Sequence, residues 1–372
     1  MHISILHNCD YDSLAEDPGL EARKEVARVA AALCHALSHD EVSAEPIGVD
    51  RSLGFVETLF RRQPILVINL CESLAGDSRG EMAIPSVLEL LGLPYTGSSA
   101  LALGLALHKD KAKQLLAARA VPTPRFCVVA QLDEVEAVTL PFPLMVKPVR
   151  EDASLGVDFD SVVSDRAALR RAASEVLATF RQPALVEQYV DGREIYVPIL
   201  GNQPRTTLPL TEIQFGKTFD ARPKILSYKA KWDLDSPECI DSPATLCAID
   251  EKNKTELIAT ALAAFEALDC RDYGRVDLRL TTDGRPYVID INPNCDLHPD
   301  AGFAKSAVAA GIDYPALALR LVEIALERSY GNSSDRPQGP RATRRAAGPN
   351  RHVFAARSQL RARAHRPRAH FE

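Results

Sequence analysis

The sequence predicts an α/β lobe at the N-terminal end, followed by an α+β body. Over the first hundred residues, short apolar runs alternate with helical patterns, the order typical of a parallel sheet with helices on its faces. Further along, strands and helices are mixed without strict alternation, which suits an α+β body. At 372 residues, with 46% apolar and 25% charged residues, the chain has the length of two or three ordinary globular domains.

Two strands and two helices are expected in the first lobe. The apolar runs HISIL and PILVINL predict strands at 2–6 and 64–70, and helical periodicity predicts helices at 21–37 and 82–93. The first helix carries its apolar residues on one face, namely Val26, Val29, Ala30, Leu33 and Leu37. The chain contains no GxGxxG and no GxxxxGK(S/T), which excludes the common dinucleotide and phosphate-loop signatures.

The body is expected to begin with one long helix at 98–120. Ser98 or Ser99 is placed to cap it, and the prolines of VPTP end it because proline has no amide donor. The remaining apolar patterns predict strands at 125–130, 143–149, 184–190 and 193–200. They also predict helices at 165–180, 255–270 and 313–329, the last capped by Asp313.

Cysteine usage and hydropathy favour a cytoplasmic protein. The eight cysteines are scattered without a CxxC pair or a short His spacing, which argues against a zinc module or a disulfide scaffold. The start of the chain has too few apolar residues for a signal peptide, and no run of 18 apolar residues occurs. We therefore expect no membrane span.

The charge is uneven along the chain. From Gly331 to the end there are ten arginines against Asp335 and Glu372, so this segment has a net charge of +8. The rest of the chain then carries about -14, because the net charge of the whole chain is -6. A Pro/Gly/Arg-rich segment with few large apolar residues buries too little surface to fold, so residues 331–372 are predicted to be a disordered tail. Nucleic-acid binding is conceivable only through this basic tail, and a compositional accident is the simpler account.

The stretch GRVDLRLTTDGRPYVIDINPN, residues 274–294, reads as a β-hairpin with acids inside apolar runs. With a four-residue turn at 281–284, Leu280 faces Arg285, and the register pairs Asp277 with Val288 and Arg275 with Asp290. Alternation then places Val276, Leu278, Ile289 and Ile291 on one face. The opposite face gathers Arg275, Asp277, Asp290 and Asn292. Such hard oxygen ligands suit Mg²⁺ held together with substrate phosphates.

Two alternatives weigh against a metal site when the hairpin is taken alone. A half-exposed hairpin can simply carry charge on its outer face. A turn with an odd number of residues would also flip the parity and separate the polar side chains. Likewise, Lys109 and Lys113 lie one helical turn apart and alone would suit a solvated helix face. The loop after Lys147, PVREDASLG, has small residues that could bring backbone amides up to a phosphate.

Taken together and in order, five segments resemble the ATP-grasp superfamily, and within it the D-alanine-D-alanine ligase-like enzymes. They are LGLPYTGSS, HKDKAKQLL, PLMVKPVREDASLGV, ALVEQYVDGREI and the hairpin stretch, and the resemblance covers roughly residues 60–328. It implies an ATP-grasp fold with an N-terminal Rossmann-like, pre-ATP-grasp lobe. The lobe would comprise residues 1–103 and the ATP-grasp domain 104–330, with a smaller subdomain at about 104–185 and a larger one at about 186–330.

The resemblance also implies roles for individual residues around ATP. Lys109 and Lys147 would hold phosphates, and Glu194 would bind the ribose. The adenine would be read by Glu187 and by the backbone of Gln188, Tyr189 and Val190. The triphosphate would be covered by Ser154, Leu155 and Gly156.

The same resemblance assigns the metal and the catalytic residues. Two Mg²⁺ ions, or Mn²⁺ in their place, would be held by Asp277, Asp290 and Asn292. Arg275 would steady the transferred phosphate, and Lys231 would reach the γ-phosphate from a mobile loop. The implied reaction is ATP-dependent joining of a carboxylate and an amine through an acylphosphate, with charge neutralised on the moving phosphoryl group.

At the substrate end the sequence departs from the family pattern. Ala153 and Ser154 stand where two serines are usual, and Trp232 stands where a tyrosine follows the loop lysine. Asp296 and Ala301 replace a glycine and a serine after the metal-binding asparagine. The N-terminal Glu that grips the first amino group has no clear counterpart, although Glu21 or Glu25 lies nearby in sequence.

These departures leave the substrates open. They are expected to be small and amino-acid-like: D-alanine twice, or other amino acids or small acids. A nucleotide-binding relative without ligase activity is a further alternative. The family resemblance is compatible with a homodimer.

Overall fold

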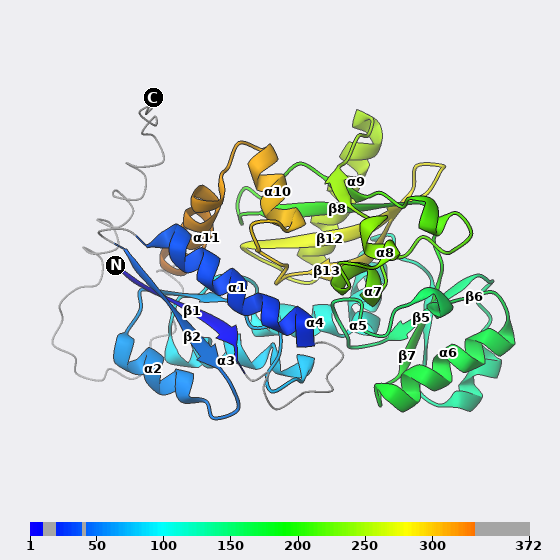
Figure 1. The fold of residues 1–372 in the computed structure, drawn as a ribbon, viewed down its shortest axis with the longest axis horizontal. Coiled ribbons are helices and arrows are strands. Elements are labelled where there is room, and N and C mark those ends of the chain that lie inside the picture. Colours follow the sequence, from blue (N-terminus) through cyan, green and yellow to red (C-terminus); the bar gives the residue numbers. More distant parts are fainter. Residues whose placement is uncertain (10–19, 39–41, 332–372) are drawn as a thin grey trace.

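In the computed structural model, which describes residues 1–9, 20–38 and 42–331, the described strands form three sheets in chain order (Figure 1). The predicted tail lies outside the described residues from position 332 onward. Short 3-10 helices connect the larger elements at Ser78–Gly80, Leu132–Ala137, Phe159–Ser161 and Lys217–Phe219. Among the described helices, none combines the length and the apolar character that crossing a membrane requires.

The first sheet is parallel, as predicted, with strand order β2-β1-β3. Its strands are β1 (His2–Asn8), β2 (Ser43–Val49) and β3 (Leu66–Asn69), and its helices are α1 (Leu20–Leu37), α2 (Gly54–Arg62) and α3 (Ala83–Leu91). The sequence did not reveal β2, because Pro46 interrupts its pattern. An edge strand tolerates that proline, and β2 lies at the edge.

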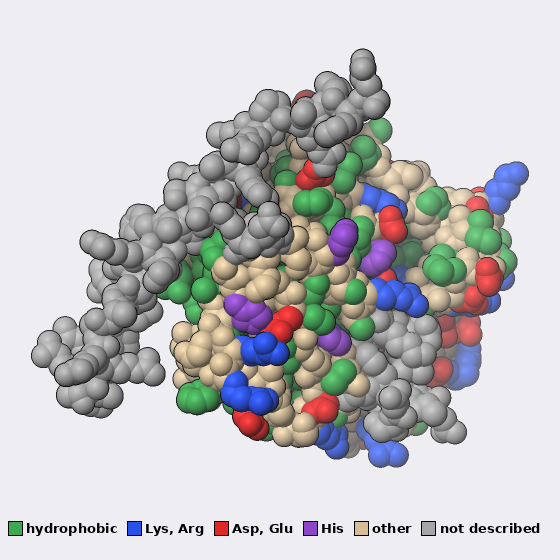
Figure 2. Space-filling model, turned by 60° about the vertical axis from the view of Figure 1, so that its left-hand side comes forward, with side chains coloured by type: hydrophobic (Ala, Val, Ile, Leu, Met, Phe, Trp, Pro, Cys, Tyr) green, Lys and Arg blue, Asp and Glu red, His purple; other side chains and the backbone are tan. Residues whose placement is uncertain are grey.

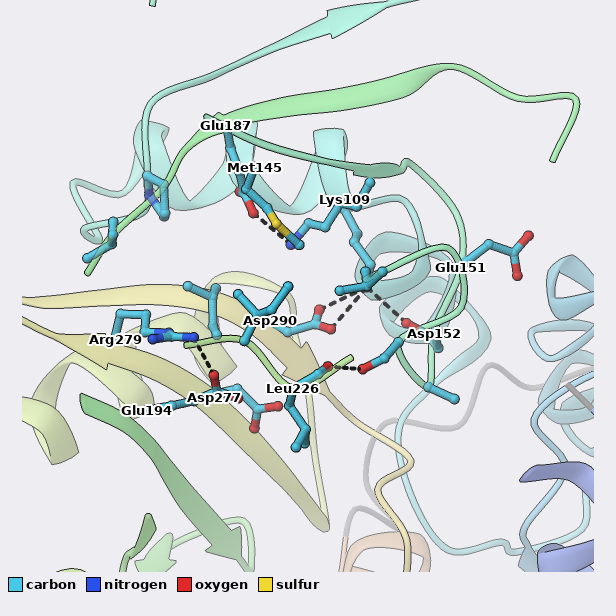
Figure 3. A pocket seen from close by; sticks show the side chains of 18 of the residues that line it. Lys109, Met145, Glu151, Asp152, Glu187, Glu194, Leu226, Asp277, Arg279 and Asp290 are labelled. Carbon is cyan, nitrogen blue, oxygen red and sulfur yellow. Dashed lines mark hydrogen bonds and ion pairs between the residues drawn. The ribbon is translucent and has the colours of Figure 1, made fainter. Parts of the chain in front are cut away.

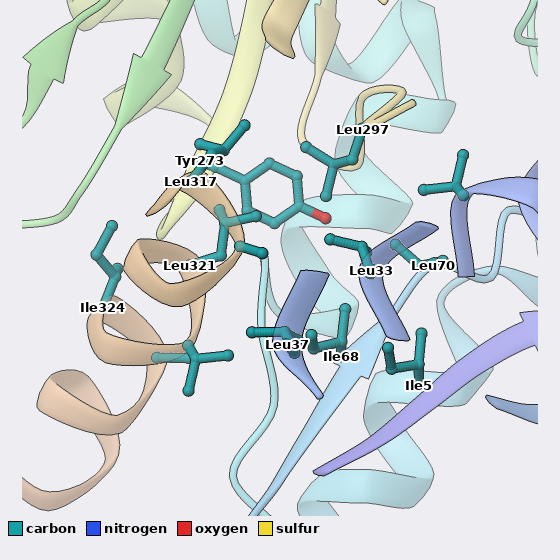
Figure 4. Packing of buried hydrophobic residues seen from close by; sticks show 14 of the residues in the cluster. Ile5, Leu33, Leu37, Ile68, Leu70, Tyr273, Leu297, Leu317, Leu321 and Ile324 are labelled. Carbon is teal, nitrogen blue, oxygen red and sulfur yellow. The ribbon is translucent and has the colours of Figure 1, made fainter. Parts of the chain in front are cut away.

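A large apolar core joins this sheet to the end of the chain. The predicted apolar face of α1 is buried, with all five of its residues at most 5% exposed. Helix α11 (Tyr314–Gly331) packs against the same core through Leu317, Leu321 and Ile324 (Figure 4). The first lobe is therefore built from both ends of the described chain.

The second sheet is antiparallel, with order β4-β7-β5-β6. Its strands are β4 (Phe126–Val129), β5 (Leu144–Pro148), β6 (Val162–Val163) and β7 (Ala184–Gln188). Helix α6 (Arg166–Thr179) begins at the side-chain cap of Asp165 and buries Leu169, Ala173 and Val176 in the core of this sheet. The opposite face of the sheet lines a cavity.

The third sheet has the order β11-β10-β8-β12-β13, with β9 paired to β8. Its strands are β8 (Arg193–Leu200), β9 (Thr206–Thr207), β10 (Thr211–Ile213), β11 (Ala244–Leu246), β12 (Tyr273–Leu280) and β13 (Pro286–Asn292). The helices of this part of the chain are α4 (Ala100–Leu107), α5 (Lys109–Ala118), α7 (Tyr228–Trp232), α8 (Pro237–Ile240), α9 (Glu251–Ala267) and α10 (Gly302–Ala309). Apolar residues of α4, α5 and α9 form one core with β8, β12 and β13.

The predicted single helix at 98–120 is wrong in one respect, because the structure breaks it into α4 and α5 at His108. Ser99 caps α4 by accepting a hydrogen bond from the backbone N–H of Ala102. At the break, the backbone N–H of Lys109 donates to the carbonyl of Val149, the residue that follows β5 (3.0 Å). This bond ties the start of α5 to the second sheet.

The predicted hairpin register is also wrong, and so is the predicted place of Ile289 on the apolar face, although the four polar residues still share a face. The ladder begins with Leu280 opposite Pro286, so the loop has an odd number of residues and the parity flips. A β-bulge next to Asp277 then adds one residue on β13 and flips it back. As a result Asp277 faces Asp290, and Arg275 faces Asn292. Val288 packs in the core, while Ile289 lines a cavity.

Candidate active site

A cavity lies between the second and third sheets, and we call it the inter-sheet cavity (Figure 3). The predicted site residues that line it are Lys109, Lys147, Ser154, Leu155, Glu187, Gln188, Tyr189, Val190, Glu194, Lys231, Asp277, Asp290 and Asn292. Gly156 and Arg275 are the predicted residues that do not line it. The fold thus gathers most of the predicted set from distant parts of the sequence.

The acidic face of the β12–β13 hairpin points into this cavity. Arg275 donates two hydrogen bonds to the carboxylate of Asp277, from Nε at 2.6 Å and from Nη2 at 2.8 Å, and Asn292 donates a third at 3.1 Å. Burial raises the pKa of Asp277, with Arg275 opposing this effect. The bulge therefore places two carboxylates and an amide on neighbouring strands at one wall.

Lys109 connects this wall to the loop after β5. Its Nζ donates to both carboxylate oxygens of Asp290 at 3.0 Å and to Asp152 at 2.9 Å (Figure 3). Burial alone would lower the pKa of Lys109, but the two aspartates outweigh it and raise the pKa. Lys109 and Lys147 in turn hold the pKa of Asp290 below its usual value, despite its burial.

Lys109 and Lys113 do not form the solvated face that the helical pattern alone allowed. Both are buried, at 6% and 3% exposure. Lys113 lies 2.7 Å from one oxygen of Glu187, and Lys147 lies 2.8 Å from the other. The two lysines outweigh the effect of burial and lower the pKa of Glu187. Sequence reasoning assigned no role to Lys113, although its spacing of four from Lys109 was the available signal.

Arg279 is a second site residue that sequence reasoning missed. Its guanidinium donates to Glu194 at 2.6 Å and to the backbone carbonyls of Gly192 and Lys224. Tyr196 donates to the other oxygen of Glu194 at 2.8 Å. Arg279 follows Arg275 and Asp277 at alternate positions of β12, so period-two spacing could have identified it.

A loop at 151–157 covers one side of the cavity in a strained conformation. Ala153 and Ser154 both have positive φ, at 54° and 62°, which is costly for residues other than glycine. Ser154 Oγ donates to the carbonyl of Leu226 (2.9 Å), and Trp232 Nε1 donates to the carbonyl of Ala153 (3.1 Å). Gly156 has a φ of 72° and packs against Pro148, where a Cβ would come within 2.7 Å.

Lys231 is unlike the other lysines of the site. Within the described residues its side chain has no hydrogen bond and no ion pair, and burial with Arg275 nearby lowers its pKa. It lines the inter-sheet cavity and also a second cavity toward the first lobe. An unpaired cation between two cavities is available to an anionic group.

The second cavity adjoins the first. The two cavities share Glu151, Asp152, Ala153, Leu155, Lys231 and Asn292. Arg275 lines the second one, together with residues of α1, α4 and the segment after β13. A phosphoryl group at the shared wall would therefore be reachable from the second cavity.

The hairpin residues fit a divalent metal held jointly with a nucleotide. Among the described residues, no three acidic, histidine or cysteine side chains are placed so that they alone could hold a metal ion. Mg²⁺ does not need such a cage, since it commonly takes one or two carboxylates plus substrate phosphates. Asp277, Asp290 and Asn292 are oxygen donors of this kind, and lysines stand ready for phosphate oxygens.

The fold is an ATP-grasp fold, and comparisons with known proteins identify the family. The family model described as the D-ala D-ala ligase C-terminus matches residues 115–323, more than half of the chain. The chain therefore belongs to the D-alanine-D-alanine ligase family, whose members are ATP-dependent ligases that form carbon-nitrogen bonds.

Individual relatives cover most of the chain. An uncharacterized protein, y4sG, of Sinorhizobium fredii is 35% identical over 82% of this chain and 89% of its own length. The D-alanine-D-alanine ligase of Aromatoleum aromaticum is 32% identical over 68% of this chain and 77% of its own. The solved D-alanine-D-alanine ligase of Bacillus anthracis, complexed with ATP, superimposes with a TM-score of 0.70 at 22% identity. It covers 88% of this chain and 98% of its own, which supports the fold.

Proposed function

We propose that the protein is an ATP- and Mg²⁺-dependent carboxylate-amine ligase that forms an amide through an acylphosphate. One observation carries the proposal. Asp277 and Asp290 face each other on the cavity wall that also presents Asn292 and several lysines. This arrangement suits the metal-bound terminal phosphates of ATP.

The nucleotide would lie between the two sheets. Glu194 and the backbone of residues 188–190 line the cavity and would bind the ribose and the adenine. Lys109 and Lys147 would hold phosphate oxygens, and Glu187 orients Lys147 by its ion pair. The magnesium ions, when bound, would neutralise charge on the terminal phosphates.

The reaction would proceed in two displacements. A carboxylate oxygen of the donor attacks the γ-phosphorus, the bond to the β-phosphate oxygen breaks, and ADP leaves. The amine of the acceptor then attacks the carbonyl carbon, phosphate leaves, and the amine loses a proton. Lys231 lies where the two cavities meet, and Arg275 lines the second cavity while bonded to Asp277. Both would stabilise the charge on the transferred group.

An assay of phosphate release with a panel of D- and L-amino acids tests the proposal. At least one combination should support turnover, and Asp277→Asn should lower its rate by about 100-fold or more. Asp283→Asn, an exposed change in the turn of the same hairpin, should leave the rate unchanged. Phosphate release that is equal in both variants would contradict the assigned site, and ATP binding without turnover would indicate a non-catalytic relative. Turnover with D-alanine alone would identify dipeptide synthesis.

A further inference from the structure

Arg279 of β12 is a buried cation on the wall of the inter-sheet cavity. Figure 2 shows lysine and arginine side chains on the outer surface of the molecule, where water solvates them. Arg279, by contrast, is only 4% exposed. A buried charge is costly unless it is paired and hydrogen-bonded, so the partners of this arginine indicate what it does.

The guanidinium of Arg279 is fixed from several directions. It donates to one carboxylate oxygen of Glu194 at 2.6 Å (Figure 3), to the carbonyl of Gly192 at 3.1 Å, and to the carbonyl of Lys224. Its central carbon also lies 5.6 Å from the centroid of the Phe215 ring, within the range of a cation–π contact. The guanidinium therefore has one well-defined place beside Glu194.

The other carboxylate oxygen of Glu194 is held as well. The hydroxyl of Tyr196 donates to it at 2.8 Å, and burial raises the pKa of Tyr196, so this hydroxyl keeps its proton. Among the described residues, no other group donates to this carboxylate. An ionised carboxylate offers about two acceptor sites on each oxygen. Arg279 and Tyr196 each use one, so one acceptor site on each oxygen stays open.

From this geometry we infer that Arg279 and Tyr196 are positioning residues that hold Glu194 to accept both ribose hydroxyls, so that the site prefers ribonucleotides. The 2′- and 3′-hydroxyls of a ribose are neighbouring donors, and they match two open acceptor sites on one carboxylate. A buried acceptor that loses its donor is costly, so a nucleotide without either hydroxyl binds less tightly. The inference rests on the proposed function, which gives the ribose to Glu194.

A second arginine of the same sheet provides a matched control. Arg193 donates two hydrogen bonds to Glu212, at 2.7 Å and 2.6 Å. Neither residue is among the described residues that line the inter-sheet cavity or the second cavity. A change at Arg193 therefore weakens an arginine–carboxylate pair of similar geometry without touching the proposed ribose site.

Binding of ADP to the full chain tests the inference. ADP has no γ-phosphate to transfer, so the measurement does not depend on either amino-acid substrate. ADP, 2′-deoxyADP and 3′-deoxyADP are each titrated with Mg²⁺ by calorimetry, and their dissociation constants are compared. The unchanged protein should bind ADP about tenfold or more tightly than either deoxy form, because a hydrogen bond to a charged group contributes that much.

Two variants test the positioning of Glu194. Arg279→Lys keeps the positive charge but loses the planar fork that fixes the carboxylate, so the preference for ADP should fall to about threefold or less. Tyr196→Phe removes only the hydroxyl and should reduce the preference in the same direction. Arg193→Lys should leave the preference unchanged. General damage to the cavity would weaken all three nucleotides equally, so the ratio of dissociation constants reports the positioning.

The outcomes separate the inference from the proposed function. If the unchanged protein binds all three nucleotides equally, or if either Arg279→Lys or Tyr196→Phe keeps the full preference for ADP, the inference is wrong. Equal weakening of all three nucleotides in these variants would indicate a purely structural role and would also overturn it. These results leave the proposed function standing, because the phosphate-release assay tests it separately. If none of the nucleotides binds, both the proposed function and the inference fail.

Discussion

Three buried carboxylates of the site are paired with nearby cations. Asp277 is held by Arg275, Asp290 by Lys109, and Glu187 by two lysines. Removing one partner from a buried pair is costly because it leaves an uncompensated charge. The site is thus held in place by paired charges before any ligand binds.

Glu187 offers a test of this pairing. Lys113 and Lys147 hold its pKa below the usual value of 4.5, so its contribution to stability is complete above that value and is lost as pH falls through the lower one. Glu187→Gln should lower the free energy of unfolding by about 3 kcal/mol at neutral pH. In urea unfolding at a series of pH values, this difference should narrow only at acid pH.

A matched control is Glu136→Gln, which removes an exposed ion pair with Arg170. It should change the free energy of unfolding by less than about 1 kcal/mol. An effect of Glu187→Gln no larger than that of the control would show that the buried cluster does not stabilise the fold.

At the scale of elements, the hairpin shows what sequence reasoning can and cannot supply. The alternation of β12 and β13 correctly predicted a polar face, yet the register was wrong. An odd loop and a bulge each flip the parity, and the two flips cancel. Neither the odd loop nor the bulge leaves a sequence pattern as strong as apolar alternation, because each depends on local backbone geometry.

Elements with a long and regular apolar pattern were predicted correctly, and short elements without such a pattern were not. The face of α1 was correct, since a long amphipathic helix carries its pattern along its length. Short elements between 201 and 250, such as α7 and β11, were not predicted, because tertiary contacts hold them. Burial of Lys109 and Lys113 was also out of reach, since their partners lie far away in sequence.

The loop at 151–157 and α7 close over the cavity together, and Trp232 joins them. Trp232→Phe keeps an aromatic ring but removes the hydrogen bond to Ala153. One such bond contributes about 1 kcal/mol, so local opening should increase about fivefold. Hydrogen exchange at the amides of residues 153–157 should accelerate by that factor, while the amides of β12 should not change. Unchanged exchange in the loop would mean that Trp232 does not hold it.

At the scale of the whole molecule, one buried carboxylate connects distant segments. Asp272 is 0% exposed and accepts hydrogen bonds from the backbone N–H of Gly97, from Asn202 and from Arg328 of α11. These partners belong to the segment before α4, to the connection between β8 and β9, and to the last described helix. The position of the second cavity depends on how these parts are joined.

Asp272→Asn should therefore weaken the whole fold by about 3 kcal/mol, because it leaves Arg328 without its buried partner. Thermal unfolding measures the effect. Asp269→Asn is the control, since Asp269 is exposed and shares the positive φ of Asp272. Equal unfolding temperatures for the two variants would show that Asp272 does not join the parts.

The measurement that tests the central claim most directly follows the oxygen atoms of the donor acid. A donor whose carboxylate carries heavy oxygen is turned over with unlabelled ATP, and the released phosphate is analysed by mass spectrometry. If the carboxylate attacks the γ-phosphorus beside Asp277 and Asp290, each phosphate will contain one heavy oxygen from the donor. Phosphate without that label would contradict the acylphosphate mechanism and the ligase function built on this site.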